Sequence, residues 1–427
     1  MLKLLTFFGG LGIFINEMQK YFAKFMEVFD TMKFPMKKVL ALCVAGLMTA
    51  SCLAGCSNEG AQSGGDGGQG GTLLIGGVGP LTGDYSTYGV SVQNGAQIAV
   101  DEINKAGGVN GVKLELKFQD DETDATKAVN AYNTLMDAGM KVSLGAVTSA
   151  ACIAVANETQ KDGILMLTPS GSQKECVQYD NCFRICFNDP QQGTVSADYI
   201  AKNMDVKKVA VIYDKSNDYS AGIADNFEKE AKVKGLEVVA KQAFTDQTNT
   251  DFNVQLQKAK DAGAELIFLP IYAQEAASIL MQAQKAGMNI PFFGCDGLDG
   301  IFEKLGKANV AASEGVMLLT PFAADAKDEK TQGFVKAYKA AYGENVTPDQ
   351  FAANGYDAVY TIKAALEKAD IKDANIDVKE LGTKLTAAMT EITVEGLTGT
   401  MTWTADGEPT KEAKAVKIVN GEYVAVD

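Results

Sequence analysis

The segment TLLIGGVGPLTGDYSTYGVSVQNGAQIAVDEINKAGG, residues 72–108, sets a pattern that the rest of the chain repeats. It opens with TLLIGGV, a short apolar run typical of a buried strand. Apolar residues then recur at spacings of four, three and four, at Val92, Ala96, Ala99 and Ile103. This spacing predicts one buried face of a helix, and the paired glycines at the end of the segment predict where that helix stops.

The same alternation of strand and helix continues in two series. The first contains the apolar runs VKLELKF, KVSLGAV and GILMLTP, and the second contains KKVAVIYD, LEVVA, AELIFLP and IPFFG. Strands that are apolar along most of their length and alternate with helices are typical of parallel sheets covered on both faces. Two such series predict an α/β protein with two doubly wound lobes. NDPQQG, residues 188–193, lies between the series and is the predicted first crossing.

The composition excludes several classes of function. The formal net charge is −15, and Arg184 is the single arginine, which argues against nucleic acid as a partner. The chain has no histidine, so Ser-His-Asp and Cys-His catalysis and His-ligated metals are excluded. GVGPLTG has the wrong spacing for a dinucleotide fingerprint, and DDETD lacks the glycine of a calcium loop. We therefore predict no catalytic residue, no cofactor and no metal site, although an exported hydrolase or lyase is the rival class.

The N-terminal region predicts export. Lys37 and Lys38 precede an apolar run that is too short to span a bilayer, and small residues follow it, as in a secretory signal. LAGC, which ends at Cys56, resembles the lipobox of bacterial lipoproteins. That resemblance implies a signal peptide at 36–55 and a lipid anchor on Cys56, on the extracytoplasmic side of the membrane. Residues 56–71 then form a flexible polar tether, and residues 1–35 are interpreted as an upstream extension of the true start.

Polar residues follow several predicted strands, at the edge where open α/β sheets bind ligands. The first series supplies Ser149, Ser170, Gly171 and Ser172, and the second supplies Tyr219, Tyr272 and Asp296. Hydroxyls and amides near a helix start suit a carboxylate, and an aspartate suits an ammonium group. Together they complement a zwitterion such as an α-amino acid. Each residue taken alone also fits an ordinary helix cap or turn, and that alternative stays open.

From residue 72 onward, the chain resembles the branched-chain amino acid binding proteins of ABC importers. The resemblance rests on the order of GPLTGDYSTYG, GAQIAVDEINKAGGVNG, DDETD, GILMLTPS, YDKSNDYSAG, QAQKAGMNIPFFG and LTGTMTWTADGEP. This Leu/Ile/Val-binding family has the type I periplasmic-binding-protein fold. The resemblance implies one lobe at 72–189 plus 320–398 and a second at 190–319 plus 399–427, joined by a hinge of three strands.

The resemblance also implies roles for individual residues. Ser149, Ser170, Gly171 and Ser172 match the carboxylate-binding set, Tyr219 and Tyr272 match tyrosines of the second lobe, Asp296 matches the acid that meets the ammonium group, and Tyr88 matches a side-chain pocket position. The implied function is capture of an amino acid, with Leu, Ile or Val favoured, by a monomer that delivers it to a permease and ATPase. Another amino acid, a short amide, an aromatic acid or a sensing role remain alternatives, because neighbours such as Ala150, Cys152 and Cys295 are local choices.

The cysteines of the exported part leave one question open. Cys176 and Cys182, in ECVQYDNC, could close a small disulfide loop in an oxidising compartment. Sequence alone does not fix the connectivity. On this prediction, Cys152, Cys186 and Cys295 stay free.

Overall fold

A computed structural model of the protein describes residues 70–411 and 414–426. The predictions for the extension 1–35, the signal peptide 36–55 and the lipid anchor on Cys56 lie outside the described residues, as does most of the tether 56–71. Among the described residues, none of the helices is both long enough and apolar enough to cross a bilayer.

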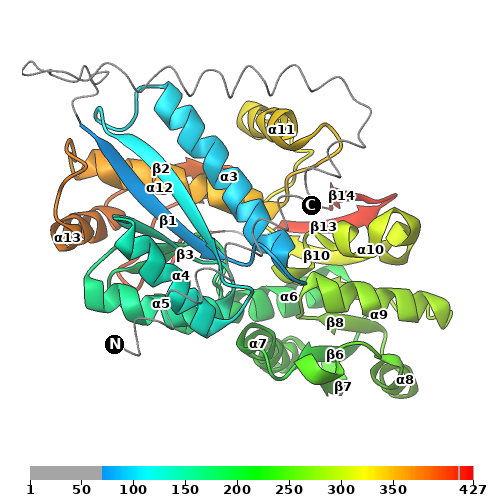
Figure 1. The fold of residues 1–427 in the computed structure, drawn as a ribbon. Helices are drawn as coiled ribbons and strands as arrows, with labels where there is room; N and C mark the ends of the chain where they lie inside the picture. The colour runs from blue at the N-terminus through cyan, green and yellow to red at the C-terminus, as the bar shows by residue number, and fades with distance from the viewer. Residues whose placement is uncertain (1–69, 412–413, 427) are drawn as a thin grey trace, which may run out of the picture. The chain divides into compact units, whose positions relative to one another are not determined.

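The first sheet is parallel throughout and has the strand order β2-β1-β3-β4-β5. Its strands are β1 (Thr72–Gly79), β2 (Lys113–Asp120), β3 (Val142–Ala146), β4 (Met166–Thr168) and β5 (Cys182–Arg184), and its connecting helices are α3 (Ser86–Lys105), α4 (Ala125–Asp137) and α5 (Ser149–Asp162). Alternate residues of β1 face opposite sides, as expected for a strand. Leu73 and Ile75 pack in the same core as α3, whereas Leu74 and Val78 pack with α4 and α5. The sheet is therefore covered on both faces (Figure 1).

The second sheet has the order β14-β13-β10-β9-β8-β6-β7. Its strands are β6 (Lys208–Asp214), β7 (Glu237–Phe244), β8 (Leu266–Leu269), β9 (Phe292–Gly294), β10 (Met317–Thr320), β13 (Lys414–Val419) and β14 (Glu422–Ala425), and its helices are α6 (Asp189–Asn203), α7 (Asp218–Lys234), α8 (Asn253–Asp261), α9 (Ala273–Lys285) and α10 (Ile301–Asn309). β6 to β10 run parallel to one another, whereas β13 pairs antiparallel with both of its neighbours, β10 and β14. Asn420 and Gly421, both with positive φ, form the two-residue turn that reverses the chain there. The prediction of purely parallel sheets missed this hairpin.

The chain passes between the two sheets three times, after β5, after β10, and between β12 and β13. The part that returns to the first sheet contains α11 (Glu329–Tyr342), α12 (Gln350–Lys368), α13 (Val378–Met389), β11 (Val394–Gly396) and β12 (Gly399–Met401). The first and third crossings are bonded to each other, because the indole of Trp403, the single tryptophan, donates to the Arg184 carbonyl at 2.7 Å.

Two glycines bring α12 directly against α3. A Cβ on Gly95 would lie 1.8 Å from the Ala352 carbonyl oxygen, and one on Gly355 would lie 2.3 Å from the Val92 carbonyl oxygen. Only glycine permits so close a backbone approach. The contact matters for function because α3 carries Tyr88 and α12 carries Phe351, and both side chains line the cavity described next.

Candidate functional site

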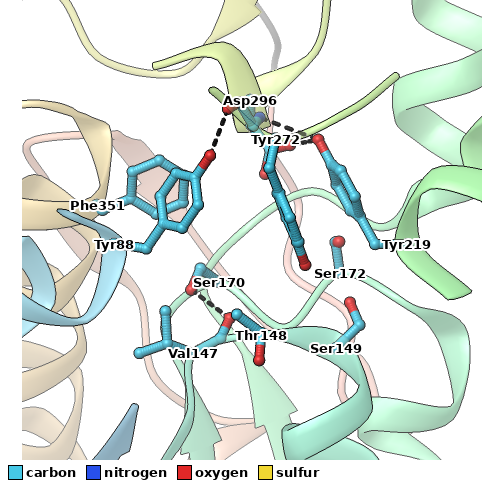
Figure 2. A pocket seen from close by; sticks show the side chains of 11 residues that line it. Tyr88, Val147, Thr148, Ser149, Ser170, Ser172, Tyr219, Tyr272, Asp296 and Phe351 are labelled. Atoms are coloured by element: carbon cyan, nitrogen blue, oxygen red, sulfur yellow. Dashed lines mark hydrogen bonds between the residues drawn. The ribbon is translucent and has the colours of Figure 1, made fainter. Parts of the chain in front are cut away.

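A small cavity lies where the carboxyl ends of both sheets meet. It is lined by Tyr88, Val147, Thr148, Ser149, Ser170, Ser172, Tyr219, Tyr272, Asp296, Gly297 and Phe351. Figure 2 shows the three serines on one side, and Tyr219, Tyr272 and Asp296 on the other. Of the residues that the sequence predicts for the site, all but Gly171 line this cavity.

The wall from the first sheet offers hydrogen-bond donors. α5 begins at Ser149, and the side chain of its N-cap, Thr148, makes no capping bond with any described residue. Backbone N–H groups of the first turn are thus left for a ligand, at the positive end of the helix dipole. Ser149 Oγ accepts from Gln173 N at 3.2 Å, which leaves its own hydrogen free to donate. Ser170 Oγ donates to the Val147 carbonyl at 2.7 Å, so it can only accept from a ligand.

The single arginine lies behind this wall. Arg184 is fully buried, and its guanidinium donates to the carbonyl oxygens of Gly171 at 2.8 Å and Gln173 at 3.0 Å. Its Nε forms an ion pair with Glu408, which comes from the third crossing, at 3.2 Å. Because the guanidinium binds these carbonyl oxygens on the side away from the cavity, the side chains of Ser170 and Ser172 in the same loop lie on the cavity side.

Gly171 has a different place from the one predicted. Its amide donates to Thr168 Oγ1 at 2.8 Å, and its carbonyl accepts from Arg184. A Cβ at Gly171 would lie 2.7 Å from Cys152 Sγ, so only glycine fits between this helix and the loop. Both backbone groups are used inside the protein. Gly171 shapes the wall from behind, and its contact with a ligand stays a prediction.

The wall from the second sheet is aromatic and acidic. The rings of Tyr219 and Tyr272 are stacked, with centroids 4.9 Å apart and an interplanar angle of 9°. Tyr219 Oη donates to Asp296 Oδ1 at 2.7 Å, and the Asp296 amide donates to Gln192 Oε1 at 3.2 Å. Burial raises the pKa of Asp296 to about 6, although the bond from Tyr219 lowers it. A cation placed beside this buried carboxylate would compensate its charge.

The remaining lining is apolar and joins the two sheets. The rings of Tyr88 and Phe351 lie 4.7 Å apart. Tyr88 Oη donates to the Gly297 carbonyl at 2.7 Å and accepts from the Ala273 amide at 2.8 Å, so α3 is bonded to two loops of the second sheet. The sequence prediction missed Phe351. No strand end marks it, and it reaches the cavity only because the glycines of α3 and α12 bring these helices together.

The suggested disulfide between Cys176 and Cys182 is not formed. Both are buried free thiols, as are Cys152, Cys186 and Cys295. Cys176 Sγ lies 3.7 Å from the Ser149 carbonyl oxygen, whereas Cys182, on β5, lies 3.6 Å from Thr159 Oγ1. The two side chains therefore have different neighbours, although both pack in the core between the first sheet and α5.

Comparisons with known proteins identify the family to which the chain is similar. A family profile described as "Periplasmic binding protein" matches residues 72–422. A "Leu/Ile/Val-binding protein homolog 3" of Brucella melitensis is 33% identical over 339 residues, which cover 79% of this chain and 88% of that protein.

Solved structures of related proteins have the same fold. The branched-chain amino acid transporter substrate binding protein LivJ of Streptococcus pneumoniae, solved with isoleucine, has a TM-score of 0.74 and 30% identity and covers 83% of this chain and 99% of its own. A solute binding protein of R. palustris, solved with benzoate, has a TM-score of 0.73 over 83% of this chain and 95% of its own. At 23% identity this second likeness concerns the fold alone.

Proposed function

Because this chain belongs to the periplasmic binding protein family and has the type I fold of that family, we propose that it is the extracytoplasmic solute-binding protein of an ABC importer. It captures a free amino acid, with leucine, isoleucine and valine preferred, and delivers it to a membrane permease driven by a separate ATPase. It binds its ligand without converting it.

One observation carries the proposal, namely the opposite character of the two ends of a single cavity. The start of α5 and Ser149 offer donors to a carboxylate, and Asp296 offers a buried carboxylate to an ammonium group. Tyr88, Val147 and Phe351 supply the apolar part of the lining, which an aliphatic side chain would contact. An aromatic acid such as benzoate would fit the anion end, but it has no cation to compensate Asp296.

The lobes are taken as 72–189 plus 320–398 and 190–319 plus 399–427, with the three crossings as the hinge. A ligand held by Ser149 and Asp296 touches both lobes, so its binding favours the closed arrangement over an open one. We further propose that the monomer is held at the membrane by lipid on Cys56, with residues 56–71 as its tether.

Isothermal titration tests the proposal directly. The protein from Gly70 onward is unfolded and refolded to remove any bound solute, and it is then titrated with single amino acids and with benzoate. We expect one site per chain and tight binding of leucine, isoleucine or valine. If benzoate binds and no amino acid does, the assignment of the two ends is wrong.

A further inference from the structure

A second buried acid lies close to the cavity without lining it. Asp189 is the first residue of α6, next to the N-cap Asn188, and its side chain is completely buried. Among the described residues, no hydrogen bond of good geometry reaches either of its carboxylate oxygens, although the Ser172 hydroxyl lies near enough to lower the pKa of this carboxyl. A buried carboxylate without a well-formed hydrogen bond is costly, so its presence needs an explanation.

The nearest polar group belongs to the cavity wall. The Asp189 amide donates to the Ser172 carbonyl at 3.0 Å, which brings the two side chains together. Ser172 Oγ also has no partner among the described residues, and its hydroxyl lowers the pKa of the Asp189 carboxyl. A hydroxyl needs only a rotation about its C–O bond to change the group to which it donates. Each of these two groups can therefore satisfy the other.

The other side of Asp189 is closed by α7. A Cβ on Gly222 would lie 3.1 Å from Asp189 Oδ2, so the helix packs directly on the carboxyl. One turn further along α6, Gln192 Oε1 accepts from the Asp296 amide. The first turn of α6 thus supports Ser172 on one wall of the cavity and Asp296 on the other. Figure 2 shows the Ser172 hydroxyl pointing toward the tyrosine side of the cavity.

We propose that Asp189 is a positioning residue that makes this site selective for ligands with an ammonium group. Its carboxylate accepts the hydrogen of the Ser172 hydroxyl, which leaves the lone pairs of Ser172 Oγ directed at the cavity. Ser172 then accepts from the ligand's ammonium group, beside Asp296, and does not serve the carboxylate end. This inference rests on the proposed function and adds a residue to it.

Electrostatics favours the same reading. Burial raises the pKa of Asp189 well above its usual range, and the negative charge of Asp296 raises it further, while Arg184 lowers it. Two carboxyl groups that disfavour each other's charge are both relieved by one cation between or beside them. A ligand with a hydroxyl in place of the ammonium group would leave both acids uncompensated, so it should bind much less tightly.

The test compares two ligands that differ only at this group. Leucine and 2-hydroxy-4-methylpentanoate are titrated into the wild-type protein, the Asp189→Asn variant and the Ser172→Ala variant, and the ratio of their dissociation constants is measured. We expect the preference for leucine to fall at least tenfold in Asp189→Asn, with a change of less than about threefold for the hydroxy acid. In the double variant, Asp189→Asn should change the ratio little beyond the change that Ser172→Ala causes alone, because the effect of Asp189 passes through the Ser172 hydroxyl.

Asp121→Asn is the matched control. Asp121 is also completely buried and also has a raised pKa, but it follows β2 and does not line the cavity. Its ratio should equal that of the wild type. An unchanged ratio in Asp189→Asn would overturn the inference, whether the two affinities stay constant or fall together. If Asp189→Asn does not fold, an unchanged ratio in Ser172→Ala overturns it equally. Failure of the wild type to bind leucine would instead contradict the proposed function.

Discussion

The two walls of the cavity treat buried charge in opposite ways. Behind the first wall, the charge of Arg184 is already matched by Glu408 and by backbone carbonyls, and the surface that faces the cavity is made of neutral hydroxyls and amides. In the second wall, Asp296 faces the cavity itself, with a tyrosine hydroxyl and neutral groups beside it. The first wall presents no uncompensated charge to the cavity, whereas the second presents the carboxylate of Asp296. We infer that the ammonium group contributes more to affinity than the carboxylate does.

Removing one key side chain from each wall should give unequal losses. Asp296→Ala should weaken leucine binding by at least about 30-fold, because truncating one member of a buried charge pair costs roughly 2–5 kcal/mol. Ser149→Ala should cost only about 1 kcal/mol, or roughly fivefold, since backbone N–H groups remain at the same end. Titration of both variants with leucine measures the difference, and equal losses would contradict the inferred inequality.

The pH dependence of binding should come from the acidic wall. The pKa of Asp296 in the free protein is about 6, and only its charged form compensates an ammonium group. Leucine affinity should therefore fall as the pH drops through 6, approaching tenfold per pH unit below it. Asp296→Asn has no carboxyl to titrate at this position and should show a weaker dependence. A steeper loss above pH 7 would point to a different group.

A further prediction concerns the contact that joins the walls. Tyr88→Phe keeps the ring beside Phe351 but removes the bonds to Gly297 and Ala273. We expect leucine affinity to fall by up to about 30-fold, from roughly 1 kcal/mol for each of the two lost bonds, with no change in the order of preference among leucine, isoleucine and valine. Tyr132→Phe is the control, because the hydroxyl of this buried residue joins α4 to Asp162 at the end of α5 and does not line the cavity. A changed order of preference would mean that Tyr88 Oη contacts the ligand.

Strands and the residues just beyond them could be predicted well from sequence. Apolar runs that alternate with helical patterns predict two doubly wound lobes, and the family resemblance implies the type I fold, which the comparisons confirm. Ser149, Tyr272 and Asp296 could be found because ligands bind at strand ends, and the structure places all three at one cavity. Their roles toward the ligand remain predictions.

Contacts between distant segments could not be predicted in this way. Phe351 reaches the cavity through a helix that packs on another helix far away in sequence, and no local pattern records that packing. The internal bonds of Gly171 were likewise not foreseen, since its amide donates to Thr168 and its carbonyl accepts from the guanidinium behind the loop. The partner of a backbone group depends on which side of a loop faces the solvent, and residue type does not specify that.

The position of Trp403 has a practical consequence. It is the single indole in the chain, it is buried, and it is bonded across two of the three crossings. Its emission therefore comes from between the first and third crossings alone, with no background from other tryptophans. The protein carries its own optical probe beside the crossings that we propose as the hinge, so motion there can be followed without attaching a dye.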